Sequence, residues 1–275
     1  MFIGWLKFRD VSRLVEIAES VGWLVDGYHM KLMMMHSPHL CYGAYEGEKL
    51  VGAIMAIEFE NSTMIKHFSV SQEYQKQGIG KRLFETLLGA LKCEYQSIYL
   101  HAHPKMVPFF ERYDFTAQMR VGRFVNVGKV PPFSFTNAHA KELDGENFES
   151  VISQIDKESF GEDRTAFLFD EMDRNSSLKF TLPNGFQHSS VINSRHVYLG
   201  PWQVRVGHEE EAEKMMRGVL YFRGLKKVVA DIPLDVAHVV ELYKRYHFEQ
   251  RAEFVHMARS TTQKVKFENI YAFSL

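Results

Sequence analysis

The spacing of apolar residues along the first half of the chain predicts alternating strands and helices. In residues 78–91, Ile79, Leu83, Leu87 and Leu91 recur every four positions, which is typical of a helix with one buried face. Short apolar runs that are bounded by turn residues indicate strands. The expected strands are residues 2–8, 41–45, 50–58, 64–70, 97–100 and 116–127, and the expected helices are residues 27–35, 78–91 and 107–113, with a further helix ending before Gly22.

The second half repeats this order of elements after a linker. Pro131 and Pro132 interrupt any element near residues 128–132, because proline lacks the N–H that helices and sheets use. Residues 109–115 resemble residues 242–248, which lie 133 positions later, and this favours duplication of one domain. The expected strands are residues 133–136, 178–182, 187–192, 197–204, 227–230, 248–258 and 267–275, and the expected helices are residues 146–157, 164–172, 209–222 and 236–246.

We therefore predict an α/β fold, of the mixed-sheet α+β type, in two domains covering residues 1–128 and 129–275. A chain of 275 residues with 45% apolar residues can bury two cores. Its formal net charge is -1 and its Lys and Arg residues are scattered, which argues against a nucleic-acid partner. The sequence has no run of transmembrane length and begins unlike a signal peptide. With only Cys41 and Cys93, it is expected to be cytoplasmic and not to associate with membranes.

The segment from Val70 to Gly80 has the features of an anion-binding loop. A strand is expected to end at Val70, and a loop with Gly78 and Gly80 follows before a helix begins. Glycines allow close approach of the backbone to a ligand, and the N-terminal amides of a helix attract an anion such as a pyrophosphate. The loop lacks the Gly-Lys-Ser/Thr ending of a nucleoside triphosphate loop and the third glycine of a dinucleotide fingerprint. A glycine turn that only opens a helix is the alternative interpretation.

The segment resembles the signature of the GNAT acetyltransferase superfamily. In that signature a strand-ending Val is followed, after four residues, by Gln/Arg-x-x-Gly-x-Gly/Ala, and Val70, Gln75, Gly78 and Gly80 match each position. The resemblance implies a mixed, V-shaped sheet and a bound acetyl-CoA (coenzyme A) cofactor. It implies that backbone groups of Phe68 and Val70 pair with the pantetheine. The implied cofactor-binding residues are Phe68, Val70, Gln75, Lys76, Gln77, Gly78, Ile79, Gly80, Lys81 and Arg82.

Within the superfamily, the chain resembles a bacterial tandem group often called YitH-like. The resemblance covers nearly the whole chain and implies two GNAT-like domains in tandem. The segments that carry it are Gly22-Trp23, residues 102–110, Phe160-Gly161-Glu162-Asp163-Arg164, Gly200-Pro201 and Ile270-Tyr271-Ala272.

The implied reaction is an N-acetyltransferase reaction, in which a primary amine of a small molecule or peptide attacks the acetyl thioester directly. The usual acid of the family, a Tyr, is replaced by Phe110. Met64 and Lys66 stand where the family often places a base, so Glu58 at the end of a strand is the candidate catalytic residue. A solvated strand-end carboxylate is the other interpretation of Glu58, and a packed histidine is the interpretation of His67. A non-catalytic acyl-CoA sensor is the alternative function, and no metal site is expected.

The second domain is expected to be degenerate. Aligned at an offset of 132, its residues Glu210 and Ala212 replace Gly78 and Gly80. Carboxylates at a helix N-terminus repel a pyrophosphate, so this domain is expected to bind no acetyl-CoA. It retains Tyr243 at the acid position, where a structural role is expected. The protein is expected to be a monomer whose two domains form a pseudo-dimer.

Overall fold

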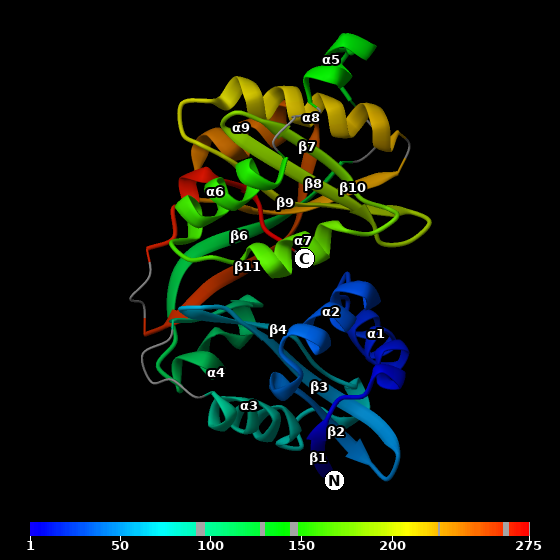
Figure 1. Cartoon of the computed structure of the whole chain (residues 1–275). Coiled ribbons are helices and arrows are strands. Elements are labelled where there is room, and N and C mark those ends of the chain that lie inside the picture. The colour runs from blue at the N-terminus through cyan, green and yellow to red at the C-terminus, as the bar shows by residue number, and fades with distance from the viewer. Residues whose placement is uncertain (92–96, 127–129, 144–147, 225, 261–263, 275) are drawn as a thin grey trace. The chain divides into compact units, whose positions relative to one another are not determined.

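The chain folds into two compact units whose boundaries differ from those of the two sequence halves. The computed structural model describes residues 1–91, 97–126, 130–143, 148–224, 226–260 and 264–274. Unit 1 comprises Met1–His101 and Ala258–Thr262, and unit 2 comprises Ala102–Met257 and Gln263–Leu275 (Figure 1). Cys93 and the predicted boundary between residues 128 and 129 lie outside the described residues.

Unit 1 is a mixed sheet with helices on both faces (Figure 1). Its strands follow in the order β1-β2-β3-β4-β5, antiparallel as far as β4, while β5 runs parallel to β4. Helix α3 buries Ile79, Leu83 and Leu87 against the sheet, as the four-residue spacing predicts. The elements are β1 (Phe2–Trp5), α1 (Val11–Ser20), α2 (Gly27–His36), β2 (Cys41–Glu46), β3 (Lys49–Glu58), β4 (Ser62–Val70), α3 (Ile79–Ala90) and β5 (Ser97–Ala102).

Unit 2 repeats the strand-and-helix order around its own core. Its strand order is β11-β6-β10-β9-β8-β7, with β12 paired to β9. The core packs Trp202 and Tyr243 with aliphatic side chains from α8, β9 and β10. The elements are α4 (Val107–Glu111), β6 (Thr116–Asn126), α5 (Asn137–Glu142), α6 (Phe148–Phe160), α7 (Thr165–Met172), β7 (Leu178–Leu182), β8 (Gly185–Val191), β9 (His196–Val204), α8 (Glu209–Arg223), β10 (Lys227–Pro233), α9 (Ala237–Arg245), β11 (Phe248–Arg259) and β12 (Ile270–Ala272).

The mixed α/β fold class is confirmed, and two of the predicted strands are corrected. Residues 133–136 form no strand, because Pro131 and Pro132 cannot donate to a sheet and the segment leaves it. Residues 267–275 were expected to be one long strand, but a short 3-10 turn (Phe267–Asn269) precedes β12. The sequence did not predict α5, which Thr136 caps by accepting a hydrogen bond from the His139 backbone N–H.

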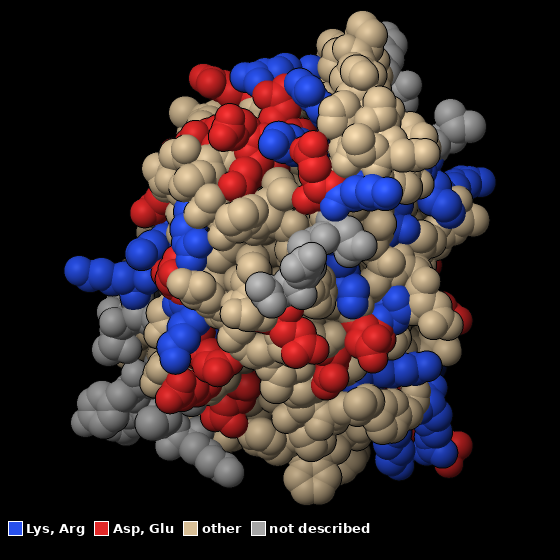
Figure 2. Space-filling model, turned by 45° about the horizontal axis from the view of Figure 1, so that its top comes forward, with Lys and Arg blue, Asp and Glu red and all other residues tan. Residues whose placement is uncertain are grey.

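Acidic and basic side chains are interspersed on the face of the molecule shown in Figure 2. No described helix is both long enough and apolar enough to cross a membrane.

Candidate functional site

The glycine loop of unit 1 has the backbone conformation that an anion site needs. After β4 ends at Val70, a short 3-10 turn (Gln72–Tyr74) leads into the loop. Lys76 and Gly78 then adopt left-handed conformations, with φ of 61° and 80°. Gly78 is the N-cap of α3 and provides no side-chain cap, so the first amides of the helix are left for another acceptor.

Six consecutive amides converge on this loop without an acceptor. Within the described part of the chain, no oxygen accepts a hydrogen bond from the backbone N–H groups of residues 76–81. Two glutamines hold the loop in place, since Gln75 Nε2 donates to the Val70 carbonyl and Gln77 Nε2 donates to the Glu73 carbonyl, each at 3.0 Å. Lys76, Lys81 and Arg82 are exposed and add positive charge. This combination favours a doubly charged anion such as a pyrophosphate.

A β-bulge interrupts β4 just before the loop. Ile54 of β3 faces both His67 and Phe68 of β4, and His67 has a φ of 49°. The parallel pairing with β5 stops at Ile65, which pairs with Leu100. The strand thus loses one neighbour where the bulge begins.

Beyond the bulge, alternate residues of β4 point their backbone groups toward the side on which β5 no longer pairs with the strand. Ser71 N–H donates to the Val51 carbonyl at 2.8 Å, so residue 71 directs its backbone groups toward β3. Successive residues of a strand point their backbone groups to opposite sides. Val70 and Phe68 therefore direct theirs to the open side, where Gln75 Nε2 donates to the Val70 carbonyl at 3.0 Å. The Phe68 ring stacks on Phe84 of α3, with centroids 5.9 Å apart.

The bulge also changes the environment of His67, which the sequence pattern suggested was simply packed. Its Nε2 lies 3.0 Å from Nδ1 of His29 on α2, and the residue stays partly exposed. Desolvation of the imidazole, together with the charge of Lys66, lowers the pKa of His67 to about 3. The ring is therefore neutral at physiological pH. A period-two pattern cannot show a bulge, so this pair cannot be predicted from the spacing of residues.

Glu58 lies at the end of β3, opposite Thr63, as expected for a strand-end residue. Its Oε2 is 3.3 Å from Nε2 of His39, and its backbone N–H donates to Ser37 Oγ at 3.0 Å. The five steps along the strand from Thr63 to Phe68 span about 16 Å, at about 3.3 Å per residue. Glu58 can thus take a proton from a ligand beside residues 66–70 of β4 only through bridging water molecules.

The ring of Phe110 is buried in α4, within unit 2. It packs against Phe109 and Phe115, with centroids 5.1 and 6.1 Å away. It carries no hydroxyl, so it has no proton to donate. Tyr243 of α9 is fully buried, and burial raises its pKa well above the ordinary value, consistent with a structural role.

Unit 2 contains the same bulge but a different loop. His188 of β8 faces both Gly200 and Pro201 of β9, and the residues preceding the two bulges, Lys66 and Leu199, are 133 positions apart. The loop that follows has only four residues, against eight in unit 1. The alignment of Gly78 with Glu210 at a constant offset is therefore wrong, because the shorter loop shifts the register.

Carboxylates occupy the helix N-terminus in unit 2. Glu209 Oε1 accepts the Gly207 N–H at 3.1 Å, and Glu211 accepts both the backbone and the side-chain N–H of Asn184. Hydrogen bonds from its own backbone and from Gly207 lower the pKa of Glu209. These side chains supply the negative charge that the end of α8 attracts, so a second anion would meet repulsion there.

The buried imidazole of His188 should make unit 2 less stable in acid. Its Nδ1 donates to the Gly200 carbonyl at 3.0 Å, so its Nε2 accepts from Ser177 Oγ at 2.8 Å, and burial lowers its pKa to about 3. Below the ordinary pKa of 6.5, the unfolded chain binds a proton that the native chain does not. We expect the free energy of unfolding to be about 2 kcal/mol lower at pH 5 than at pH 8 because of this group. Urea denaturation at both pH values measures it, and His188→Gln should weaken the dependence; equal slopes in the two proteins would contradict the prediction.

No cluster of three or more His, Cys, Asp or Glu suited to a metal ion occurs among the described residues.

Comparisons with known proteins were made for the whole chain. Residues 24–131 and 152–272 match two family profiles, each described as an acetyltransferase (GNAT) domain. No curated protein sequence matches the chain. A structure of a candidate acetyltransferase from Pyrococcus horikoshii is 20% identical, with a TM-score of 0.80 over 100% of this chain and 94% of that one.

Two further structures share the fold. A tandem GNAT protein from the clavulanic acid biosynthesis pathway is 13% identical, with a TM-score of 0.63 over 94% of this chain and 97% of that one. A GCN5-related N-acetyltransferase from Sphaerobacter thermophilus is 12% identical, with a TM-score of 0.62 over 94% and 95%. At such identities these structures show a common fold alone.

Proposed function

Because the chain belongs to the GNAT acetyltransferases, with two such domains in tandem, we propose that it transfers an acetyl group from acetyl-CoA to a primary amine of a small molecule or peptide. The observation that carries the proposal is the set of six amides at residues 76–81 that donate to no oxygen of the described residues, next to a bulged strand whose pairing with β5 stops at Ile65. We assign the two domains to residues 1–128 and 129–275, and the protein to the cytoplasm as a monomer without nucleic-acid or membrane partners.

The loop would hold the cofactor through its pyrophosphate. The amides of residues 76–81 would donate to the phosphate oxygens, and the charges of Lys76, Lys81 and Arg82 would lower the energy of the bound anion. Val70 and Phe68 would pair with the extended pantetheine through their backbone groups. When bound, acetyl-CoA supplies an activated thioester whose thiol is a good leaving group.

The chain's own residues would manage the protons. An amine that attacks the carbonyl becomes positively charged and must lose a proton, which we assign to Glu58 through a chain of several water molecules. His39 at 3.3 Å would hold the carboxylate in place. A backbone N–H at the bulge would donate to the developing oxyanion. Since Phe110 has no acidic hydrogen, the leaving thiolate would take its proton from solvent.

The test of the proposal has two stages. Acetyl-CoA is titrated calorimetrically, and a panel of amines is then screened for release of free CoA. Binding followed by amine-dependent release supports the enzyme. Binding without release from any amine would favour the alternative, a non-catalytic acyl-CoA sensor, which the replacement of the usual Tyr by Phe110 supports. No binding at millimolar acetyl-CoA would exclude both.

Replacement of Glu58 by Gln should lower kcat by about 100-fold, a typical loss for a missing general base, while the KM for acetyl-CoA stays unchanged. The measurement is steady-state kinetics with an amine found in the screen. His67→Gln is the comparison variant: a larger loss in it than in Glu58→Gln would show that the proton passes to His67 and not to Glu58.

A further inference from the structure

The space between β9 and β10 in unit 2 is filled by another strand of the same chain. The parallel pairing of β9 with β10 stops where Tyr198 pairs with Val229. Farther along, β12 pairs with β9, with Ile270 opposite Gln203 and Ala272 opposite Trp202. On the other side, the Phe273 N–H donates to the Asp231 carbonyl of β10 at 2.9 Å. The C-terminal strand thus bridges the two strands where they diverge.

The side chains of this strand are buried as deeply as core residues. Ile270, Tyr271, Ala272 and Phe273 are each at most 6% exposed. The Tyr271 ring lies 5.1 Å from Trp202, and the Phe273 ring stacks on His256 at 6.1 Å. The strand is therefore an integral part of unit 2.

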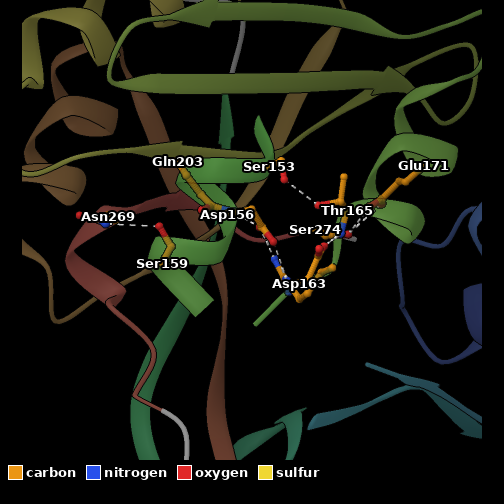
Figure 3. A network of polar contacts seen from close by, with 10 residues as sticks. Ser153, Asp156, Ser159, Asp163, Thr165, Glu171, Gln203, Asn269 and Ser274 are labelled. Carbon is orange, nitrogen blue, oxygen red and sulfur yellow. Dashed lines mark hydrogen bonds and ion pairs between the residues drawn. The ribbon is translucent and has the colours of Figure 1, made fainter. Parts of the chain in front are cut away.

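Polar contacts fix the residues on both sides of β12 (Figure 3). Asn269 Nδ2 donates to Ser159 Oγ of α6 at 3.3 Å, and Asn269 Oδ1 accepts the Val206 N–H. Ser274 Oγ donates to the buried carboxylate of Glu171 on α7, at 2.7 Å. The register of the strand is thus set from both ends.

The corresponding place in unit 1 is the open side of β4. There, too, the parallel pairing stops beside a bulge, at Ile65 and Leu100. Among the described residues, no strand pairs with residues 66–70 on the side away from β3. The two units therefore share the same bulged strand and the same divergence, but only unit 2 has a strand inserted.

We propose that residues 270–273 occupy, in unit 2, the cleft that receives the extended arm of acyl-CoA in unit 1, so that the protein binds one acyl-CoA per chain. The stoichiometry rests on the proposed function of unit 1, whereas the occupied cleft stands on the contacts of β12 alone. The backbone of β12 pairs with β9 as a peptide ligand pairs with a sheet edge. Glu209 and Glu211 lie in the first turn of α8, the helix that follows β9 as α3 follows β4.

Calorimetric titration with acetyl-CoA tests the stoichiometry. We expect one site per chain in the wild-type protein, and only a site weakened at least about 100-fold in Gly78→Glu, whose altered loop lies in unit 1. Two sites in the wild-type protein, or one site of wild-type affinity remaining in Gly78→Glu, would overturn the inference. No site in the wild-type protein would overturn the proposed function of unit 1 instead. The inference about β12 would then be decided by two further variants, Gly200→Ala and its control Gly207→Ala.

Those variants test the inserted strand directly. A Cβ at Gly200, whose φ is 144°, would overlap the carbonyl oxygen of Phe273. Gly200→Ala should therefore speed the release of C-terminal residues by a carboxypeptidase at least tenfold and lower the Tm by roughly 5–10 °C. Gly207→Ala is the matched control, because Gly207 also has a positive φ, of 86°, but has no atom near its Cβ position. Equal digestion rates in the two variants would show that β12 does not depend on this cleft.

Discussion

The variant Gly78→Glu is expected to bind acetyl-CoA at least about 100-fold more weakly than the wild-type protein, a loss of roughly 3 kcal/mol. Gly78 has a φ of 80°, a conformation that costs residues with a Cβ about 1 kcal/mol or more. The new carboxylate would also lie among the free amides of residues 76–81 and compete for them. Isothermal titration calorimetry gives the dissociation constant.

The control for this variant is Gly89→Glu. Gly89 lies on the same helix, α3, is exposed, has no positive φ and has open space at its Cβ position. It therefore adds the same charge to the same helix without touching the loop, and it should bind acetyl-CoA as the wild-type protein does. Unchanged binding in Gly78→Glu would refute the loop assignment, and equal losses in both variants would indicate a general charge effect.

The second large effect is expected from Asp156→Ala, which should lower the free energy of unfolding by about 3–5 kcal/mol. Asp156 is 1% exposed and accepts three hydrogen bonds, two from the Arg164 guanidinium and one from Gln203 Nε2 (Figure 3). The Arg164 guanidinium also lies 3.3 Å from the centre of the Phe160 ring. Removing the carboxylate takes away the acceptor of two hydrogen bonds from a guanidinium whose side chain is only 14% exposed.

Chemical denaturation followed by circular dichroism measures this loss. A double replacement, Asp156→Leu with Arg164→Met, removes both charges and should recover most of the stability, because a buried ion pair is often replaceable by apolar residues. A loss in the double variant as large as in Asp156→Ala would show that packing and not charge determines the effect. The segment Phe160–Arg164, singled out by the resemblance to the tandem group, would thus have a structural role.

The sequence predicts the helices and the glycine loop well because both rest on local patterns. The four-residue spacing of Ile79, Leu83 and Leu87 fixes the buried face of α3, and Gly78 marks the turn before it. The two bulges and the short loop of unit 2 could not be predicted from the sequence. A bulge inserts one residue into a strand, and the alternation of apolar and polar residues does not mark its position. His67 adopts a positive φ of 49°, which is uncommon for a residue other than glycine and which no spacing pattern predicts.

Long-range pairing is the other part that the sequence could not show. Residues of β6 from Val121 to Val125 pair with β10, more than one hundred positions later, and no local pattern selects that partner. The role of Ile270–Ala272 was missed for the same reason. The sequence pattern predicts these residues only as a strand near the end of the chain. Their place between β9 and β10 is evident only from the structure, where those two strands diverge.

Unit 1 includes residues from near the end of the chain, and this affects how the protein can form during synthesis. Unit 1 includes Ala258–Thr262, and Ser97 Oγ donates to the Ser260 carbonyl at 3.0 Å. A ribosome that has translated residues 1–128 has therefore made a chain that still lacks part of unit 1, although translation proceeds from the N-terminus. The first unit can be completed only after nearly the whole chain has emerged.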